Sequence, residues 1–408
     1  MSETSFGPGN PRPYLDPTGL SPETLAVRGG QARSTFDETS EGLYLTSGFV
    51  YGSAEEAEAS FTQEVEKFVY SRYGNPTVAM FEERLRVLEG AEAAYATASG
   101  MSAVFTALAA LVGSGDRLVS SRGLFGSCFV IVDEILPRWG VETVLVDGHD
   151  LDQWREALSE PTTAVFFETP SNPMQELVDI AAVSELAHAA GAQVVVDNVF
   201  GTPVFSRPLE HGADIVVYSA TKHIDGQGRV LGGAILGPQE YIDGPVQNLV
   251  RHTGPSMSAF NAWVLLKGLE TMDLRVRRMA ESSLAVARAL QSHPRVTQVI
   301  HPWLPDHPQH DLATAQMSGG GTVLTLAIDG GKAEAFAVMN SLRLVDISNN
   351  LGDSKSLITH PATTTHRRMG EEARAAIGIT DATLRISVGL EAPDDLVADI
   401  TAALDGLG

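Results

Sequence analysis

Lys222 and Asp197 are the residues whose types and spacing point most directly to chemistry. Lys222 ends the segment Tyr218-Ser219-Ala220-Thr221-Lys222, which follows the apolar residues 215–217, and Asp197 follows the apolar residues 194–196. A primary amine can condense with an aldehyde to form an imine and can later carry protons. A carboxylate can keep a ring nitrogen protonated, so that the ring accepts electrons. The pair therefore predicts a site for pyridoxal phosphate and a reaction on amino acids.

Hydroxyl residues and a glycine predict where the phosphate of this cofactor binds. Ser219 and Thr221 precede Lys222, and the segment Ala98-Ser99-Gly100-Met101-Ser102 follows an expected strand and opens an expected helix. Free N–H groups at the start of a helix bind anions, and Gly100 allows a close approach of the backbone. Ser99 alone would indicate an ordinary helix cap. Together with Ser219 and Thr221 it indicates a phosphate cup.

The elements that must position these residues alternate between strand and helix. Expected strands lie at 93–96, 117–120, 142–146, 164–167, 193–196, 215–218 and 233–236, with expected helices at 102–112, 126–136, 151–158 and 181–190. This alternation predicts an α/β fold, a mostly parallel sheet with helices on both faces. Glu168, Asp197 and Ser219 then lie at the carboxyl ends of strands, where ligands bind in such sheets.

The pattern changes near Met257, which predicts a second, smaller α+β domain. Expected helices lie at 258–269, 272–291, 332–341 and 393–407, and expected strands at 296–300, 322–328, 342–348 and 384–388. We therefore divide the chain into an N-terminal arm (1–72), a large cofactor-binding domain (73–256) and a C-terminal domain (257–408).

Composition limits the class of protein. The chain has 408 residues, 43% of them hydrophobic, which suits a large core and two or more domains. The formal net charge of −23 argues against nucleic acid or an anionic membrane as a partner. The single cysteine, Cys128, lies in an apolar run and is expected to be a buried hydrophobe, in keeping with a reducing compartment.

The termini and histidines add no targeting or metal signal. The N-terminus lacks the basic start and apolar core of a signal peptide, and the longest helical apolar run, 103–112, is shorter than the ~20 residues that span a bilayer. His301, His307 and His310 lack the spacing of a helical metal site. We expect a cytoplasmic protein without a bound metal.

Several motifs together resemble one family. The chain is similar to the Cys/Met-metabolism family of pyridoxal-phosphate enzymes, within fold type I, from about residue 24 to residue 391. The resemblance rests on YSRYGNPT, ATASGMSA, ETPSNP, VVVDNVF, YSATKHIDG, LGDSKSLITHPA and LRISVGLE, which occur in the family's order.

The resemblance implies roles for matching residues. Lys222 would carry the cofactor, Asp197 would pair with its ring nitrogen, and Asn172 would bind the ring's 3-oxygen. Gly100, Met101, Ser219 and Thr221 would hold the phosphate, and Ser356 and Arg385 would orient the α-carboxylate of the substrate. Tyr70 and Arg72 would reach into the neighbouring subunit's site, which implies a homo-oligomer of at least two chains, usually a tetramer built from dimers with shared active sites.

One departure from the family narrows the expected activity. Many members carry Tyr in a Leu-Tyr-Gly motif that stacks on the cofactor, whereas this chain has Leu124-Phe125-Gly126. Phe125 can stack but has no hydroxyl for proton transfer, which argues against a lyase. Phe125 and the runs at 352–356 and 360–366 are similar to those of homoserine sulfhydrylases.

The implied reaction is a γ-replacement that converts O-succinylhomoserine and sulfide to homocysteine and succinate, as in methionine biosynthesis. Cystathionine γ-synthesis with cysteine, use of O-acetylhomoserine, γ-elimination, and a catalytically silent regulatory relative stay open as alternatives. A succinyl tail needs a cation, and Arg229, Arg122 and Lys355 are three candidates that the sequence does not rank.

Overall fold

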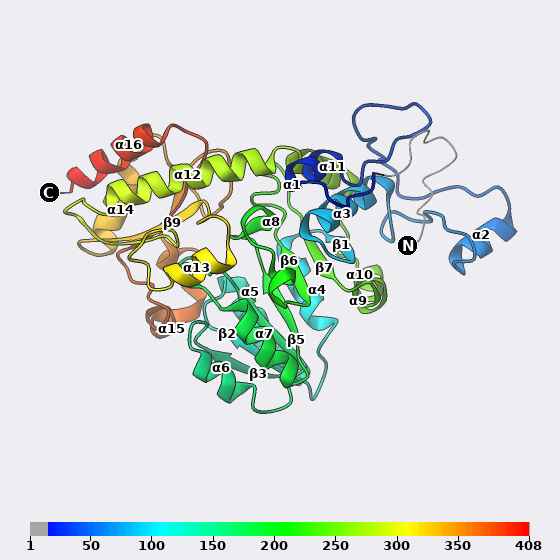
Figure 1. Cartoon of the computed structure of the whole chain (residues 1–408), viewed down its shortest axis with the longest axis horizontal. Helices are drawn as coiled ribbons and strands as arrows, with labels where there is room; N and C mark the ends of the chain where they lie inside the picture. Colours follow the sequence, from blue (N-terminus) through cyan, green and yellow to red (C-terminus); the bar gives the residue numbers. More distant parts are fainter. Residues whose placement is uncertain (1–14, 408) are drawn as a thin grey trace.

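Two β-sheets, one in each half of the chain, organise the fold (Figure 1). The computed structural model describes residues 15–407, so the first 14 residues of the predicted arm and Gly408 lie outside the described residues. Within the described part, no helix has the length and apolar character that a membrane crossing requires.

The first sheet has seven strands in the order β1-β7-β6-β5-β4-β2-β3. Strands β3, β2, β4, β5 and β6 run parallel, and β7 is antiparallel to β1 and β6. The predicted mostly parallel sheet is therefore confirmed. The strands are β1 (Ala93–Thr97), β2 (Arg117–Ser121), β3 (Glu142–Val146), β4 (Ala164–Glu168), β5 (Gln193–Asp197), β6 (Ile215–Tyr218) and β7 (Gly233–Gly237).

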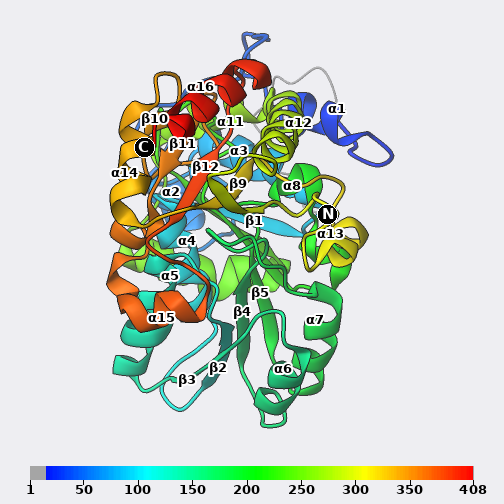
Figure 2. The same cartoon turned by 90° about the vertical axis from the view of Figure 1, so that its left-hand side faces the viewer.

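Helices cover both faces of this sheet because its strands bury side chains on both sides (Figure 2). Val195 packs with Cys128 and the helices α4 (Gly100–Ala109) and α5 (Gly126–Val130). Val194 and Val196 pack on the other face, against α6 (Leu151–Ala157) and α7 (Ile180–Ala189). The burial expected for Cys128 is confirmed, and burial raises the pKa of its thiol.

The helix expected at 126–136 is only partly regular. After α5 the backbone widens into a π-helix, η1 (Ile131–Ile135), and then tightens into a 3₁₀ helix, η2 (Leu136–Trp139). Pro137 has no N–H to donate and its ring crowds the preceding turn, so a regular α-helix cannot continue through it.

The second sheet has five strands in the order β10-β11-β12-β9-β8 and packs against three helices. The strands are β8 (Val296–Ile300), β9 (Val323–Ile328), β10 (Asp346–Ile347), β11 (Leu357–Thr359) and β12 (Thr383–Ser387). The helices are α12 (Met272–Leu290), α14 (Lys332–Ser341) and α16 (Pro393–Asp405). In Figure 2 this part lies above the large sheet. The sheets lie on either side of the proposed domain boundary at 256/257, which stays a prediction.

The strand expected at 342–348 is mostly wrong. Only Asp346 and Ile347 pair with a neighbouring strand. The N–H groups of Arg343 and Leu344 donate to the carboxylate of Asp399 on α16, at 3.0 and 2.9 Å. This capping by a helix side chain draws the segment away from the sheet. The strand β11 was not predicted.

The N-terminal residues 15–89 form three helices, of which one stands apart. Helices α1 (Pro22–Arg28) and α3 (Pro76–Glu89) pack on each other, and Arg84 of α3 forms a buried ion pair with Glu41. In contrast, α2 (Ala54–Phe61) lies away from both sheets (Figure 1). Phe36 and Val50 in this part are 88% and 89% exposed.

Shorter elements complete the described chain. They are α8 (Thr202–Phe205), η3 (Pro208–His211), α9 (Gln239–Tyr241), η4 (Ile242–Val246), α10 (Gln247–Thr253), α11 (Ala259–Leu269), α13 (His310–Gln316), η5 (Pro361–Thr363), η6 (Arg367–Met369) and α15 (Gly370–Ala376). Of these, η5 and η6 matter most for the site, because they line its cavity.

Candidate active site

Two buried carboxyl groups meet where β4 and β5 end. Glu168 and Asp197 are register partners, and both are buried. Burial raises the pKa of Asp197 to about 7, although the N–H of Val199 donates to its Oδ1 at 3.1 Å. Burial, together with the charge of Asp197, raises the pKa of Glu168 well above its usual range. In the described chain no cation pairs with Asp197, so a protonated ring nitrogen would suit it.

Glu168 also fixes two residues of the predicted site. Its Oε2 accepts from the N–H of Phe125 at 2.8 Å, and its Oε1 accepts from the N–H of Asn172 at 3.0 Å. The sequence placed Glu168 at a strand end but gave it no role. Its structural contribution is to hold two loops at the end of the sheet.

Lys222 follows β6, and its side chain reaches the segment between β10 and β11. Its Nζ donates to Oδ1 of Asn350 at 2.5 Å. Burial, and next the positive charge of Arg385, lower the pKa of Lys222 to about 8. An amine with this pKa is partly unprotonated near neutral pH, as a nucleophile and proton carrier must be. The sequence analysis missed Asn350, whose only signal was its place just before the motif that begins at Leu351.

Arg385 lies on β12, and its two terminal nitrogens bond to residues of this site. Its Nη1 donates to Oδ1 of Asn172 at 3.0 Å, and its Nη2 donates to the carbonyls of Asn349 and Asn350, both at 3.0 Å. Its Nε is buried and has no partner among the described residues. Burial lowers the pKa of Arg385 to about 10, which still leaves it charged at neutral pH. A buried, rigid cation with a spare donor suits a substrate carboxylate.

The structure does not bring Ser356 into this group. Its buried hydroxyl donates to Oε2 of Glu391 at 2.8 Å and accepts from the N–H of Gly389 at 2.9 Å. These bonds tie the loop after β12 to the start of β11. Asn350, and not Ser356, is the polar side chain that reaches Lys222.

The residues of the predicted phosphate cup lie where α4 meets the end of β6, and their role in binding phosphate stays a prediction. A Cβ added at Gly100 would lie 2.4 Å from Cβ of Ser219 and 2.6 Å from its Oγ, so only glycine allows this approach. Ser99 caps α4 by accepting from the N–H of Ser102 at 3.2 Å. Thr221 accepts from the N–H of Gly232 at 3.1 Å. The Ser219 hydroxyl thus lies beside the free N–H groups of a helix, which suits a phosphate.

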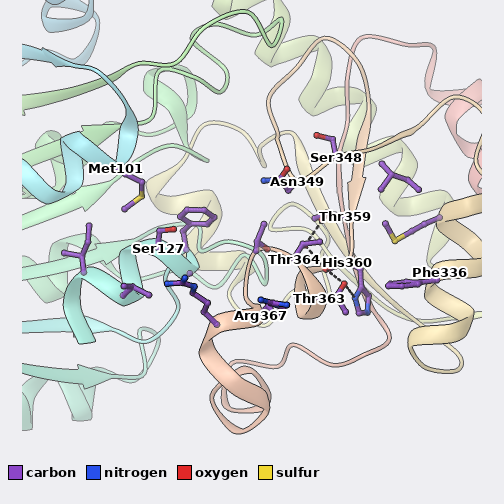
Figure 3. A pocket seen from close by; sticks show the side chains of 18 of the residues that line it. Met101, Ser127, Phe336, Ser348, Asn349, Thr359, His360, Thr363, Thr364 and Arg367 are labelled. Carbon is purple, nitrogen blue, oxygen red and sulfur yellow. Dashed lines mark hydrogen bonds between the residues drawn. The ribbon is translucent and has the colours of Figure 1, made fainter. Parts of the chain in front are cut away.

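A cavity of about 1040 Å³ lies beside the group (Figure 3). Met101 and Phe125, at and near the starts of α4 and α5, line it together with Ser348 and Asn349, which follow β10. The carbonyl of Asn349 also accepts from Arg385, so the cavity adjoins the residues around Lys222. We call these the Lys222 group: Asn172, Asp197, Lys222, Asn350 and Arg385. Within residues 15–407, no cluster of His, Cys, Asp and Glu could hold a metal ion.

Tyr70 and Arg72 lie away from this cavity in the same chain. The guanidinium of Arg72 donates to the carbonyl of Arg251 and lies 5.1 and 4.8 Å from the ring centroids of Tyr70 and Tyr73. Neither residue lines the cavity. Their predicted role in a neighbouring subunit's site stays a prediction.

The sheet, the lysine after β6 and the carboxylate at the end of β5 define the class of fold type I pyridoxal-phosphate enzymes. The family model described as "Cys/Met metabolism PLP-dependent enzyme" matches residues 23–405, and the chain belongs to that family. Pyridoxal phosphate is therefore its cofactor, and the residues described above fit it.

Curated relatives match almost the whole chain. An O-succinylhomoserine sulfhydrylase of Mycobacterium tuberculosis is 68% identical over 96% of this chain and 98% of its own. An enzyme of the same name from Pseudomonas aeruginosa is 48% identical over 96% of this chain and 97% of its own. An L-methionine gamma-lyase of Porphyromonas gingivalis is 39% identical over 94% of this chain and 97% of its own.

Solved structures share the fold at lower identity. A cystathionine gamma synthase of Xanthomonas oryzae pv. oryzae in complex with aminoacrylate and cysteine has a TM-score of 0.90 at 34% identity, over 95% of this chain and 98% of its own. A putative O-acetylhomoserine (thiol)-lyase of Campylobacter jejuni, which carries a pyridoxyl-lysine, has a TM-score of 0.91 at 31% identity. The match covers 95% of this chain and 100% of that one.

Proposed function

We propose that this chain is an O-succinylhomoserine sulfhydrylase, which converts O-succinylhomoserine and sulfide to homocysteine and succinate. In the reaction a C–O bond at Cγ of the homoserine ester breaks and a C–S bond forms there. The observation that carries the proposal is the near full-length likeness to two relatives of that name, in a chain that keeps the complete lysine site.

When bound, pyridoxal phosphate supplies an electron sink for charge that develops at Cα of an amino acid. Lys222 would hold it covalently, Asp197 would pair with its ring nitrogen, and Asn172 would face its 3-oxygen. Gly100, Met101, Ser219 and Thr221 would hold its phosphate. Phe125 would stack on its ring.

The chain's own residues then bind the substrate and move protons. The guanidinium of Arg385 holds the α-carboxylate, with its unpaired Nε as an available donor. With the substrate in place, the Lys222 amine removes the Cα proton, and removal of a Cβ proton lets succinate leave from Cγ. Asn350 accepts from the Lys222 Nζ and so orients this base.

Phe125 accounts for replacement in preference to elimination. It occupies the position where the family's lyases use a tyrosine, and its side chain carries no proton to transfer. Sulfide can then add at Cγ before the unsaturated product is released. Homocysteine is the expected product.

The proposal includes an oligomer with shared sites in the cytoplasm. Tyr70 and Arg72 would complete the site of the neighbouring subunit in a dimer, and two dimers would form a tetramer. The highly exposed Phe36 and Val50, in the same N-terminal part of the chain, support contact with a second copy. Mixing the inactive variants R72A and K222A would restore roughly a quarter of the activity if sites are shared, since hetero-dimers regain one intact site in two.

A competition assay tests the reaction itself. The holoenzyme is given O-succinylhomoserine with sulfide and cysteine together, and the products are identified by mass spectrometry. Homocysteine as the main product is expected. Cystathionine as the main product would make the chain a γ-synthase, and release of 2-oxobutanoate alone would make it a lyase.

A further inference from the structure

The cavity beside Lys222 has an unusual charge for this protein. Its lining includes Arg367 and Arg368, and within the described chain no aspartate or glutamate lines it. The whole chain carries a formal charge of −23, with 51 acidic residues against 28 basic ones. A cavity without carboxylates in so acidic a protein attracts anions and turns cations away.

Both arginines are free to bind a ligand. Arg367 and Arg368 are exposed, and across residues 15–407 neither side chain has an ion pair or a hydrogen bond. The three cations considered from the sequence are paired elsewhere and do not line the cavity: Arg122 with Asp147 at 2.5 Å, Arg229 with Asp225 at 2.9 Å, and Lys355 with Asp353 at 3.0 Å.

The segment that carries these arginines is fixed to the active site on two sides. The Nε2 of the buried His366 donates to the carbonyl of Asn172 at 3.0 Å, and its Nδ1 accepts from the Thr365 hydroxyl at 2.8 Å. On the other side, a Cβ added at Gly126 would lie 2.3 Å from the carbonyl oxygen of Thr365. Arg367 is thus held next to the residues that follow Phe125.

Hydroxyl groups accompany the arginines. Figure 3 shows Arg367 near Thr363 and Thr364, with Ser127 and Met101 on the large-domain side of the cavity. The Thr364 hydroxyl donates to the carbonyl of His360 at 2.8 Å, so the guanidinium groups are the donors that this lining offers to a carboxylate. Phe125 and Met101 add apolar side chains to the same lining, which suits a short methylene chain.

We propose that Arg367 and Arg368 form the subsite for the terminal carboxylate of the succinyl ester. The inference rests on the proposed function. The α-carboxylate lies at Arg385, the ester passes Phe125, and the second carboxylate reaches the two arginines. This subsite selects a dicarboxylic monoester over an acetyl ester, which ends in a methyl group.

Ester selectivity is the first test. In R367A, R368A and the double variant, kcat/KM is measured for O-succinylhomoserine and O-acetylhomoserine with sulfide. The double variant is expected to lose about tenfold or more on the succinyl ester, with the acetyl ester changed less than about twofold. R367K should recover part of the loss, because it restores the charge without the fork. R122A, which also removes one arginine, is the matched control and should alter neither ester selectively.

Binding of free succinate gives a readout without turnover. Calorimetric titration of the wild-type holoenzyme with succinate should show binding that is weakened about tenfold or more in the double variant. Equal losses on both esters, or unchanged succinate binding, would overturn the subsite and leave the proposed function intact. A wild-type enzyme that makes no homocysteine from the succinyl ester would overturn both.

Discussion

The Lys222 group and the proposed subsite formed by Arg367 and Arg368 adjoin the same cavity but differ in their environment. Lys222, Asp197 and Arg385 are largely buried, and burial shifts the pKa of each. Arg367 and Arg368 are exposed and have no partner within the described residues. The contrast indicates a division of work. In the proposed function, the buried group performs the reaction and the Arg367–Arg368 subsite selects the ester.

The two environments also predict different consequences of mutation. A buried ionisable residue cannot be removed without leaving its partners unpaired, so its loss affects both rate and stability. An exposed arginine in high dielectric contributes little to folding, so its loss affects binding alone. The predictions below test this contrast from the largest expected effect to the smallest.

Removal of the lysine amine should have the largest effect. K222A is expected to lose about 10³-fold or more in kcat, because no other amine lies in the group to carry the Cα proton. Steady-state assays of homocysteine formation measure this. K222R, which keeps a cation but not the nucleophile, is the matched control and should be as inactive. Substantial turnover by either variant would show that the reaction does not need the Lys222 amine.

Loss of the buried guanidinium should come second. R385A is expected to lower kcat/KM about 10²-fold or more, because the α-carboxylate loses its partner and Oδ1 of Asn172 loses a donor. R385K keeps the charge and should recover only part, since it lacks the fork. Kinetics with both esters measure the effect. The loss should be equal for succinyl and acetyl substrates, unlike the loss in R367A.

The shifted pKa of Asp197 predicts how stability depends on pH. Without cofactor, the folded chain keeps a proton that the unfolded chain releases above about pH 4, since the folded pKa is about 7. The free energy of unfolding therefore falls as pH rises from about 4 to 7. This contribution is of order 4 kcal/mol at most.

D197N should remove that part of the pH dependence. Urea denaturation of the cofactor-free protein at several pH values between 4 and 8 measures it. The wild-type holoenzyme is the control: a protonated ring nitrogen beside Asp197 favours the ionised carboxylate, so its stability should fall less over this range. A steeper pH dependence in D197N would contradict the raised pKa.

The smallest effect should come from the ring at position 125. F125Y adds one hydroxyl without removing the N–H that bonds Glu168, so the fold should be unchanged. We expect a few-fold rise in 2-oxobutanoate release relative to homocysteine, because a phenol can transfer protons. F125L removes the ring and adds no hydroxyl, so it shows what the loss of stacking alone does to the product ratio. Identical product ratios in all three proteins would show that Phe125 does not set the preference for replacement over elimination.

Most of the reactive group was predictable because parallel strands bring their ends together. The strands at 142–146, 215–218 and 296–300 have the predicted limits, and Asp197 and Lys222 follow from the apolar runs before them. Gly100 and Ser219 were predictable as neighbours for the same reason. In each case, local patterning and sheet topology are sufficient.

Contacts between side chains far apart in the sequence were not predictable. The bond from Lys222 to Asn350 joins residues 128 positions apart, and the only signal for it is the place of Asn350 just before the motif that begins at Leu351. Ser356 was expected to orient the α-carboxylate because it matches the family's motif, yet its hydroxyl bonds lead to Glu391 and Gly389. Arg367 was overlooked because the cavity that it lines is formed by residues from distant parts of the sequence.

Reduction with borohydride tests the central claim most directly. The holoenzyme is reduced, digested and mapped by mass spectrometry, which locates the lysine that carries the cofactor. The account predicts a pyridoxyl group on the peptide that contains Lys222, and on no other lysine peptide. A pyridoxyl group on a different lysine, with Lys222 unmodified, would contradict it.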